Sequence, residues 1–285
     1  MRNRWSSTIA ALAGALALSL LASAQTAQPP QATGENSKWM YNGRNRITGS
    51  GGPAPVHDLS GTWAGPRSGA GVPDLRRGEK PSLTPMGQDL FSANKSLGDY
   101  SPAATNDPFV RTCDPLGFPR AAIDEIRGVS FARTADRIVV LYQFQQVWRE
   151  IWMDGRELPK NAGAAEKGAP DARYFGYSVG HWEGDNTLVV DTTGLDDRTW
   201  IDRDGHPHTV GAHVQERYTR PDHNNLEVTI TFDDAKIYTK PFSLGTVYFK
   251  WIPNQIFDEK LCIPSETIEY LKSVGDPAGS NASLK

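Results

Sequence analysis

The stretch Leu226-Glu-Val-Thr-Ile-Thr-Phe232 alternates apolar and polar residues without interruption, and this alternation decides the fold class. Successive side chains of an extended chain point to opposite faces, so the stretch predicts a strand with one buried and one solvated face. Turn-forming residues stand on both sides of it, Pro221-Asp-His-Asn-Asn225 before and Asp233-Asp234 after. Similar short runs between turn residues fill residues 129–252. They predict an all-β, mainly antiparallel domain with roughly eight or nine strands and no long helix among them.

These strands form the centre of a larger expected domain, residues 58–271. A row of neighbouring strands has two open edges that invite aggregation, so we expect it to close into an up-and-down barrel or to form a closely related sandwich. Residues 58–128 contain many Pro and Gly residues and predict an irregular cover segment. Within it, Thr84 as N-cap and Pro85 at the first helical position predict a short helix over residues 83–96. Another short helix is expected at residues 264–271, before a tail of residues 272–285.

The first residues predict export from the cytoplasm. Arg2 and Arg4 precede an apolar run at residues 9–21, and Ala22-Ser-Ala24 supplies small residues where a signal peptidase cleaves. The apolar run is shorter than the roughly 20 residues of a membrane span, so residues 1–24 read as a signal peptide. Residues 25–57, rich in Pro, Gly, Gln and Ser, predict a flexible leader. We expect a periplasmic or secreted protein with no integral membrane segment after cleavage.

The cysteines and the charge narrow the class of protein further. There are two cysteines, Cys113 and Cys262, and an even number in an exported chain predicts one disulfide between them. The alternative is two separate buried thiols, which behave as small apolar side chains. The formal net charge of −3 and the scattered Lys and Arg residues exclude a nucleic-acid partner, since such a protein needs a basic face.

Four longer sequence motifs resemble those of known proteins. They are Leu59-Ser-Gly-Thr-Trp63, Cys113-Asp-Pro-Leu-Gly-Phe-Pro-Arg120, Ile151-Trp-Met-Asp-Gly-Arg-Glu-Leu-Pro-Lys160 and Gly176-Tyr-Ser-Val-Gly-His-Trp-Glu-Gly184. In these phrases the chain resembles a group of uncharacterised exported bacterial proteins that is common in soil and acidobacterial genomes. That group has no established activity, so the resemblance implies no catalytic residues. The Gly61-Thr62-Trp63 opening and the run of strands are also similar to lipocalin-type β-barrels, which implies a lipocalin-like fold and nothing about function.

Residues 191–216 hold the densest group of titratable side chains. In an extended segment His206 and His208 point to the same side, as two ligands of one metal ion would. A bulge at Gly211 would bring His213 to that side, and Asp191 or Glu216 would complete a site for a divalent metal. The candidate catalytic residues are accordingly Asp191, His208 and His213. The alternative is a solvated loop, which the turn Asp202-Arg-Asp-Gly205 and Pro207 favour.

Aromatic residues beside the predicted strands form the second candidate site. The proposed ligand-binding residues are Trp148, Trp152, Arg198, Trp200 and His206. If one face of each strand lines a barrel, amphipathic rings can stack on a ligand and hydrogen-bond to it. The alternative is that these rings are ordinary core residues.

The strand at residues 148–153 also predicts a charge in apolar surroundings. Glu150 shares a face with the two tryptophans, and Arg149 shares the other face with Ile151. A buried charge needs a partner, and the candidate pairs are Arg149 with Asp191 and Glu150 with Arg198.

Three functional interpretations follow from these patterns. The leading one is an exported β-barrel protein that binds a small apolar or aromatic molecule. The first alternative is a metal-assisted or acid/base hydrolase, lyase or isomerase on the same scaffold. The second is an envelope interaction module without a small ligand.

Overall fold

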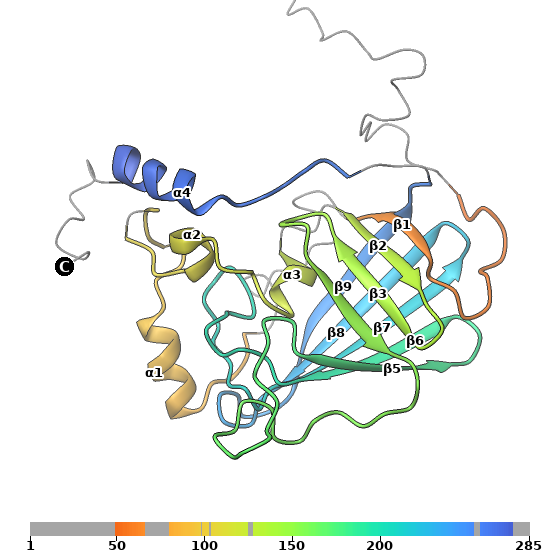
Figure 1. Cartoon of the computed structure of the whole chain (residues 1–285), viewed down its shortest axis with the longest axis horizontal. Helices are drawn as coiled ribbons and strands as arrows, with labels where there is room; N and C mark the ends of the chain where they lie inside the picture. Colours follow the sequence, from red (N-terminus) through yellow and green to blue (C-terminus); the bar gives the residue numbers. More distant parts are fainter. Residues whose placement is uncertain are drawn as a thin grey trace, which may run out of the picture. The chain divides into compact units, whose positions relative to one another are not determined.

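The computed structural model of the chain describes residues 49–65, 80–97, 99–102, 104–124, 128–253 and 257–275. The predicted signal peptide, most of the predicted leader and residues 276–285 of the predicted tail lie outside them. Within the described part, nine strands form a closed barrel in chain order (Figure 1). The strands are β1 (Gly61–Ala64), β2 (Gly128–Arg133), β3 (Arg137–Tyr142), β4 (Trp148–Trp152), β5 (Tyr177–Glu183), β6 (Thr187–Thr193), β7 (His213–Asp222), β8 (Asn225–Asp233) and β9 (Phe242–Trp251). The predicted all-β barrel is therefore confirmed.

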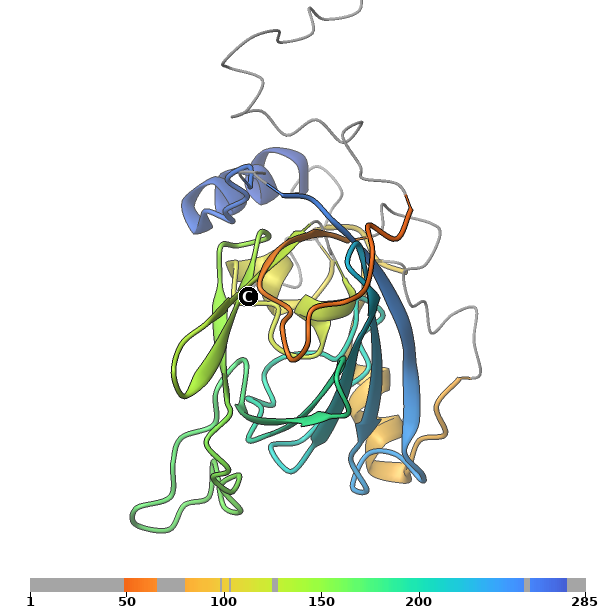
Figure 2. The same ribbon diagram turned by 90° about the vertical axis from the view of Figure 1, so that its right-hand side faces the viewer.

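Strand pairing is antiparallel around the barrel except between β4 and β5. These two strands run parallel, with Ile151 opposite Ser178. A parallel pair needs a long connection that brings the chain back to the end where it started, and residues 153–176 provide it. The barrel closes where Trp63 of β1 pairs with Trp251 of β9. Figure 2 shows the strands curving around a common interior.

The interior holds one hydrophobic core. In β8 the four residues Leu226, Val228, Ile230 and Phe232 are buried, and the residues between them are not, as the alternation predicts. The same period of two places alternate side chains of β3 and β7 in the core, whereas in β6 Val189 is buried as well as its neighbours Leu188 and Val190. Alternation therefore determines which side chain of each strand faces the interior.

One end of the barrel is covered by the residues that precede β1. The backbone N–H of His57 donates to the carbonyl of Asp185, and that of His223 donates to Gly52. Residues 49–57, the last part of the predicted leader, are thus hydrogen-bonded to the β5–β6 and β7–β8 hairpins. Inside this end lies Arg220, which is buried and donates to the carbonyls of Asp58 and His223.

Three short helices lie on one side of the strands in Figure 1: α1 (Pro85–Ala93), α2 (Pro108–Thr112) and α3 (Arg120–Ile123). Helix α1 begins as predicted, because Thr84 accepts a hydrogen bond from the N–H of Gly87 and a proline follows it. The segment that leads into α3 reaches the core, where Phe118 and Ile123 are completely or almost completely buried. This segment covers the interior from the side of the helices.

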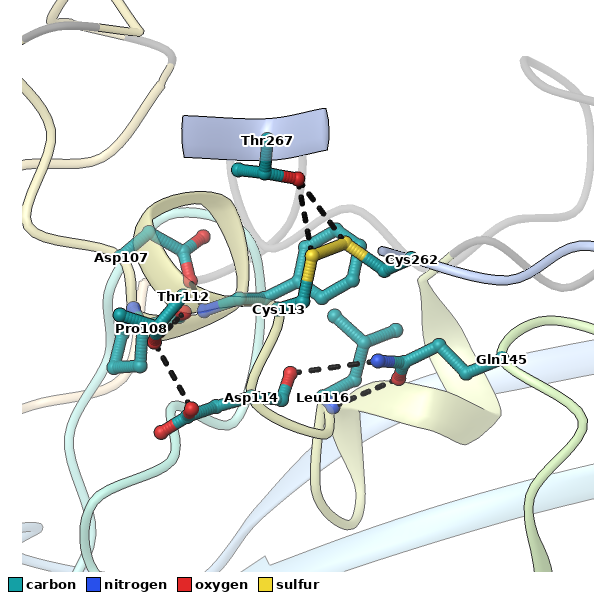
Figure 3. The surroundings of a disulfide bond; sticks show 10 residues. Asp107, Pro108, Thr112, Cys113, Asp114, Leu116, Gln145, Cys262 and Thr267 are labelled. Atoms are coloured by element: carbon teal, nitrogen blue, oxygen red, sulfur yellow. Dashed lines mark hydrogen bonds between the residues drawn. A yellow bond between two sulfur atoms is a disulfide. The ribbon is translucent and has the colours of Figure 1, made fainter. Parts of the chain in front are cut away.

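A disulfide joins Cys113, directly after α2, to Cys262, directly before the C-terminal helix α4 (Pro264–Tyr270), as predicted. Their Cα atoms are 5.5 Å apart, and the hydroxyl of Thr267 lies beside both sulfur atoms (Figure 3). The side chain of Gln145, from the β3–β4 hairpin, accepts a hydrogen bond from the N–H of Leu116. The disulfide and the hydrogen bond from the β3–β4 hairpin together hold the start of the segment that enters the core. A π-helical turn, η2 (Leu271–Gly275), follows α4.

None of the helices in the described residues is both long and apolar enough to cross a bilayer.

Candidate functional site

The predicted histidine site is not assembled in the structure. His206 is buried and bonds through Nδ1 to Asp202 at 2.7 Å. His208 is also buried, and its ring nitrogens lie 2.8 Å from the Thr199 hydroxyl and 3.1 Å from the Thr209 carbonyl. Burial lowers the pKa of His208, so its imidazole stays neutral near neutral pH. Each of these rings is held by its own partners.

His213 lies apart from them at the start of β7. Its ring is partly exposed and bonds to Asp191 at 2.9 Å, on the outer side of the barrel. The next residue, Val214, points into the core, so His213 points outward. The bulge predicted at Gly211 therefore does not turn His213 to the side of His206 and His208. In the described residues, no three His, Cys, Asp or Glu side chains are placed to hold a metal ion together. His206, His208 and His213 therefore do not form the predicted metal site.

The predicted aromatic residues do not line the barrel either. The burial pattern of β4 turns Arg149 and Ile151 inward, and Trp148 and Trp152 outward. Trp148 is 58% exposed. Trp152 is stacked between the guanidinium groups of Arg137 and Arg156. Trp148 therefore lies in solvent and Trp152 is covered by two arginines, so neither residue contributes to the interior.

Trp200 and Arg198 belong to the loop between β6 and β7. Trp200 is buried there, with the guanidinium of Arg120 at 5.7 Å from its ring centre. Arg198 has an exposed side chain that donates to both oxygens of Asp196 and keeps the pKa of that carboxyl below its usual value. The two residues that were predicted to share a ligand thus make separate structural contacts.

The charge predicted in β4 is buried, but both of the candidate pairs are wrong. Arg149 is ion-paired with Glu216 of β7, and Glu150 is ion-paired with Arg137 of β3. Inside the barrel, Arg149 lies beside Val140 in the register of β3 and β4 and reaches across to the inward face of β7. Asp191 could not be its partner, because it points to the outer side with His213.

Arg149 and Glu216 are the centre of a group that we call the interior polar cluster: Tyr142, Arg149, Glu216 and Tyr218. The hydroxyl of Tyr218 donates to one oxygen of Glu216, and Nη2 of Arg149 donates to the other. The side chains of Arg149 and Glu216 are 2% and 0% exposed, so the pair is removed from water. Phe118, from the segment before α3, packs its ring 4.0 Å from the guanidinium carbon.

The pKa values of the interior polar cluster follow from this burial. Burial alone would lower the pKa of Arg149, but the attraction of Glu216 outweighs it and the pKa is raised. Burial raises the pKa of Tyr142 to about 12, although the charge of Arg149 and the neighbouring hydroxyl of Tyr218 oppose the rise. Burial and the negative charge of Glu216 also raise the pKa of Tyr218. At neutral pH the guanidinium of Arg149 is therefore charged and both phenols are protonated.

Three buried atoms of this cluster have no hydrogen-bond partner within the described part of the chain: Nε and Nη1 of Arg149 and the hydroxyl oxygen of Tyr142. Leaving a buried polar group unsatisfied costs about 1–3 kcal/mol, and native proteins rarely leave one without a water molecule or a ligand. The three atoms belong to two neighbouring side chains in an apolar interior.

Sequence reasoning missed Glu216 as the partner of Arg149 and missed both tyrosines. The sequence did contain a signal: Glu216 lies two residues after Val214 and two before Tyr218, on the face of the strand that alternation assigns to the core. A charged residue at a position that alternation assigns to the core requires a partner. Strand β4 carries one such residue, Arg149, and β7 carries two, Glu216 and Arg220.

A second buried ionic network holds the cover segment in place. Arg120 of α3 donates to both oxygens of Asp107, at 2.9 and 2.6 Å, and to Asp124 at 3.3 Å. Burial raises the pKa of Asp124 to about 6, although the charge of Arg120 opposes the rise. All polar atoms of Arg120 thus have partners, so this network reads as structural rather than as a binding site.

Comparisons of the chain with protein-family models, with curated proteins and with solved structures found no match. The interior polar cluster is consequently interpreted from its own geometry.

Proposed function

We propose that this protein binds a small, largely apolar or aromatic molecule inside its barrel, where a polar atom of the molecule bonds to Arg149 and Tyr142. The observation that carries this proposal is the set of three buried, unpartnered atoms on these two side chains. An interior that had only to be stable would replace them with apolar side chains of similar volume, because a half-satisfied buried network is less stable than an apolar core.

The surroundings of the interior polar cluster support the apolar part of the proposal. Val140 and Val190 flank Arg149 and Glu216 in the strand register, and Phe131 packs edge-on against Tyr218. A site with an apolar wall and few polar groups is typical for small organic molecules. The disulfide supports a protein that works in an oxidising compartment, such as the periplasm or the exterior of the cell.

The experiment is a binding titration with acetylnaphthalene, an aromatic ketone, followed by calorimetry. Wild-type protein and Trp148→Phe are expected to bind it equally, because Trp148 points outward. Tyr142→Phe is expected to bind about tenfold more weakly, since it lacks one hydrogen bond to the ketone. If the wild-type protein binds no member of a panel of small aromatic and aliphatic molecules, the proposal is wrong.

A further inference from the structure

The charges of the interior polar cluster are already balanced before a ligand arrives. Arg149 is the cation and Glu216 the anion, and they are in direct contact. The other buried arginine that faces the interior, Arg220, lies four residues further along β7, about 13 Å away at the rise of a strand. It is enclosed by two tryptophan rings and donates to two backbone carbonyls, while its Nε has no partner within the described residues. Among the described residues that form the interior polar cluster, therefore, no positive charge is left over to neutralise an anion.

The unpartnered atoms of Arg149 and Tyr142 can nevertheless donate hydrogen bonds to an acceptor on a ligand. Both oxygens of Glu216 are used, one by Tyr218 and one by Arg149. The nitrogen atoms left on Arg149 only donate hydrogen bonds, and the hydroxyl of Tyr142 also donates once its ligand offers an oxygen. A molecule that presents only donors could bond to the hydroxyl oxygen of Tyr142 but would leave Nε and Nη1 of Arg149 without a partner.

From these two facts we infer that the interior polar cluster selects neutral molecules with an accepting oxygen, such as ketones, aldehydes or esters, over carboxylates of the same size. This inference rests on the proposed function. A carbonyl oxygen accepts the hydrogen bonds of Arg149 and Tyr142 without adding charge. A carboxylate would place a second negative charge beside Glu216 in an interior removed from water, where burying an uncompensated charge is unfavourable.

Three probes with one ring system separate the contributions: acetylnaphthalene carries a carbonyl, naphthoate a carboxylate, and ethylnaphthalene no acceptor. Calorimetric titration of the wild-type protein near neutral pH is expected to show the ketone binding about tenfold or more tightly than either of the others. If naphthoate binds as tightly as the ketone, the inference is overturned while the proposed function stands. If ethylnaphthalene binds as tightly, the inference is overturned together with the hydrogen bonds to Arg149 and Tyr142 that the proposed function includes. If none of the three probes binds, the inference is overturned, and the panel of small aromatic and aliphatic molecules decides whether the proposed function stands.

Glu216→Gln tests the reason for the selectivity. Glutamine keeps the shape, and its oxygen can still accept from Arg149 while its NH2 group donates to the hydroxyl oxygen of Tyr218, but it leaves the arginine without a counter-ion. The ratio of ketone to naphthoate affinity is expected to fall by about tenfold or more. A matched control is Glu183→Gln, which removes the same charge from an exposed pair with Arg217 and should leave the ratio unchanged. An unchanged ratio in a folded Glu216→Gln variant overturns the inference; if that variant does not fold, the wild-type ranking of the three probes decides.

Discussion

Replacing Tyr142 with Phe removes one oxygen atom that is buried and has no hydrogen-bond partner within the described residues. In ligand-free protein this removes an unsatisfied group, so the free energy of unfolding is expected to stay the same or to rise by up to about 1 kcal/mol. With saturating acetylnaphthalene the sign reverses. A tenfold weaker affinity lowers the stabilisation by the ligand by about 1.4 kcal/mol. Urea unfolding at a fixed protein concentration, with and without the ketone, measures both values.

Tyr218→Phe is the matched control, because it removes the same atom from a tyrosine that does have a partner. Its hydroxyl donates to the buried carboxylate of Glu216, so its loss is expected to cost about 1.5–3 kcal/mol in the ligand-free protein. If Tyr142→Phe destabilises the ligand-free protein as much as Tyr218→Phe does, its hydroxyl has a partner without any ligand. The reasoning from unpartnered atoms would then be refuted.

Three further outcomes are expected. The pKa of Asp124 is raised to about 6 in the folded protein from 3.8, so its ionisation destabilises the fold as pH rises from about 4 to about 7. Asp124→Asn should therefore gain stability relative to wild type over that window, by up to about 3 kcal/mol, and a difference independent of pH in urea unfolding would contradict this. The double variant Cys113→Ser, Cys262→Ser should lose about 2–5 kcal/mol, because the bond joins residues 149 positions apart, and an unchanged melting temperature would count against it. His208→Ala should lower the melting temperature while His213→Ala, half exposed, leaves it nearly unchanged, and neither should alter ketone affinity. Equal losses of stability, or weaker binding by either variant, would show that the histidines have been misplaced.

The fold was largely predictable because it depends on local patterns. Alternation in residues 226–232 identifies a strand and its buried face without knowledge of any neighbour. Thr84 followed by Pro85 marks the start of a helix in the same local way. The disulfide was predictable because the chain has two cysteines, which leave one pairing. The parallel contact of β4 with β5 was not, since the return of residues 153–176 depends on packing far from either strand.

The site was harder to predict because it depends on which strands face each other across the interior. Arg149 and Glu216 are separated by 67 residues, and only the closed barrel brings them together. Counting titratable residues favoured the segment around His206 and His208, yet its polar groups bond to neighbours in the same loop. The segment with the most titratable residues is a loop whose polar groups bond to one another. The candidate site is instead indicated by charged residues, Arg149 and Glu216, at positions that alternation assigns to the core.

The central claim, that a small molecule binds inside the barrel at Arg149, is tested most directly by nitrogen-15 NMR of the side-chain N–H groups during a titration with acetylnaphthalene. The Nε–H signal of Arg149 can be assigned by its absence in Arg149→Lys. The indole signal of Trp148, which is exposed on the outside, serves as a reference in the same spectra. We predict that the Arg149 signal shifts and saturates with the calorimetric affinity while the Trp148 signal stays in place. A shift of the Trp148 signal with an unchanged Arg149 signal would place the ligand on the outer surface and contradict the account.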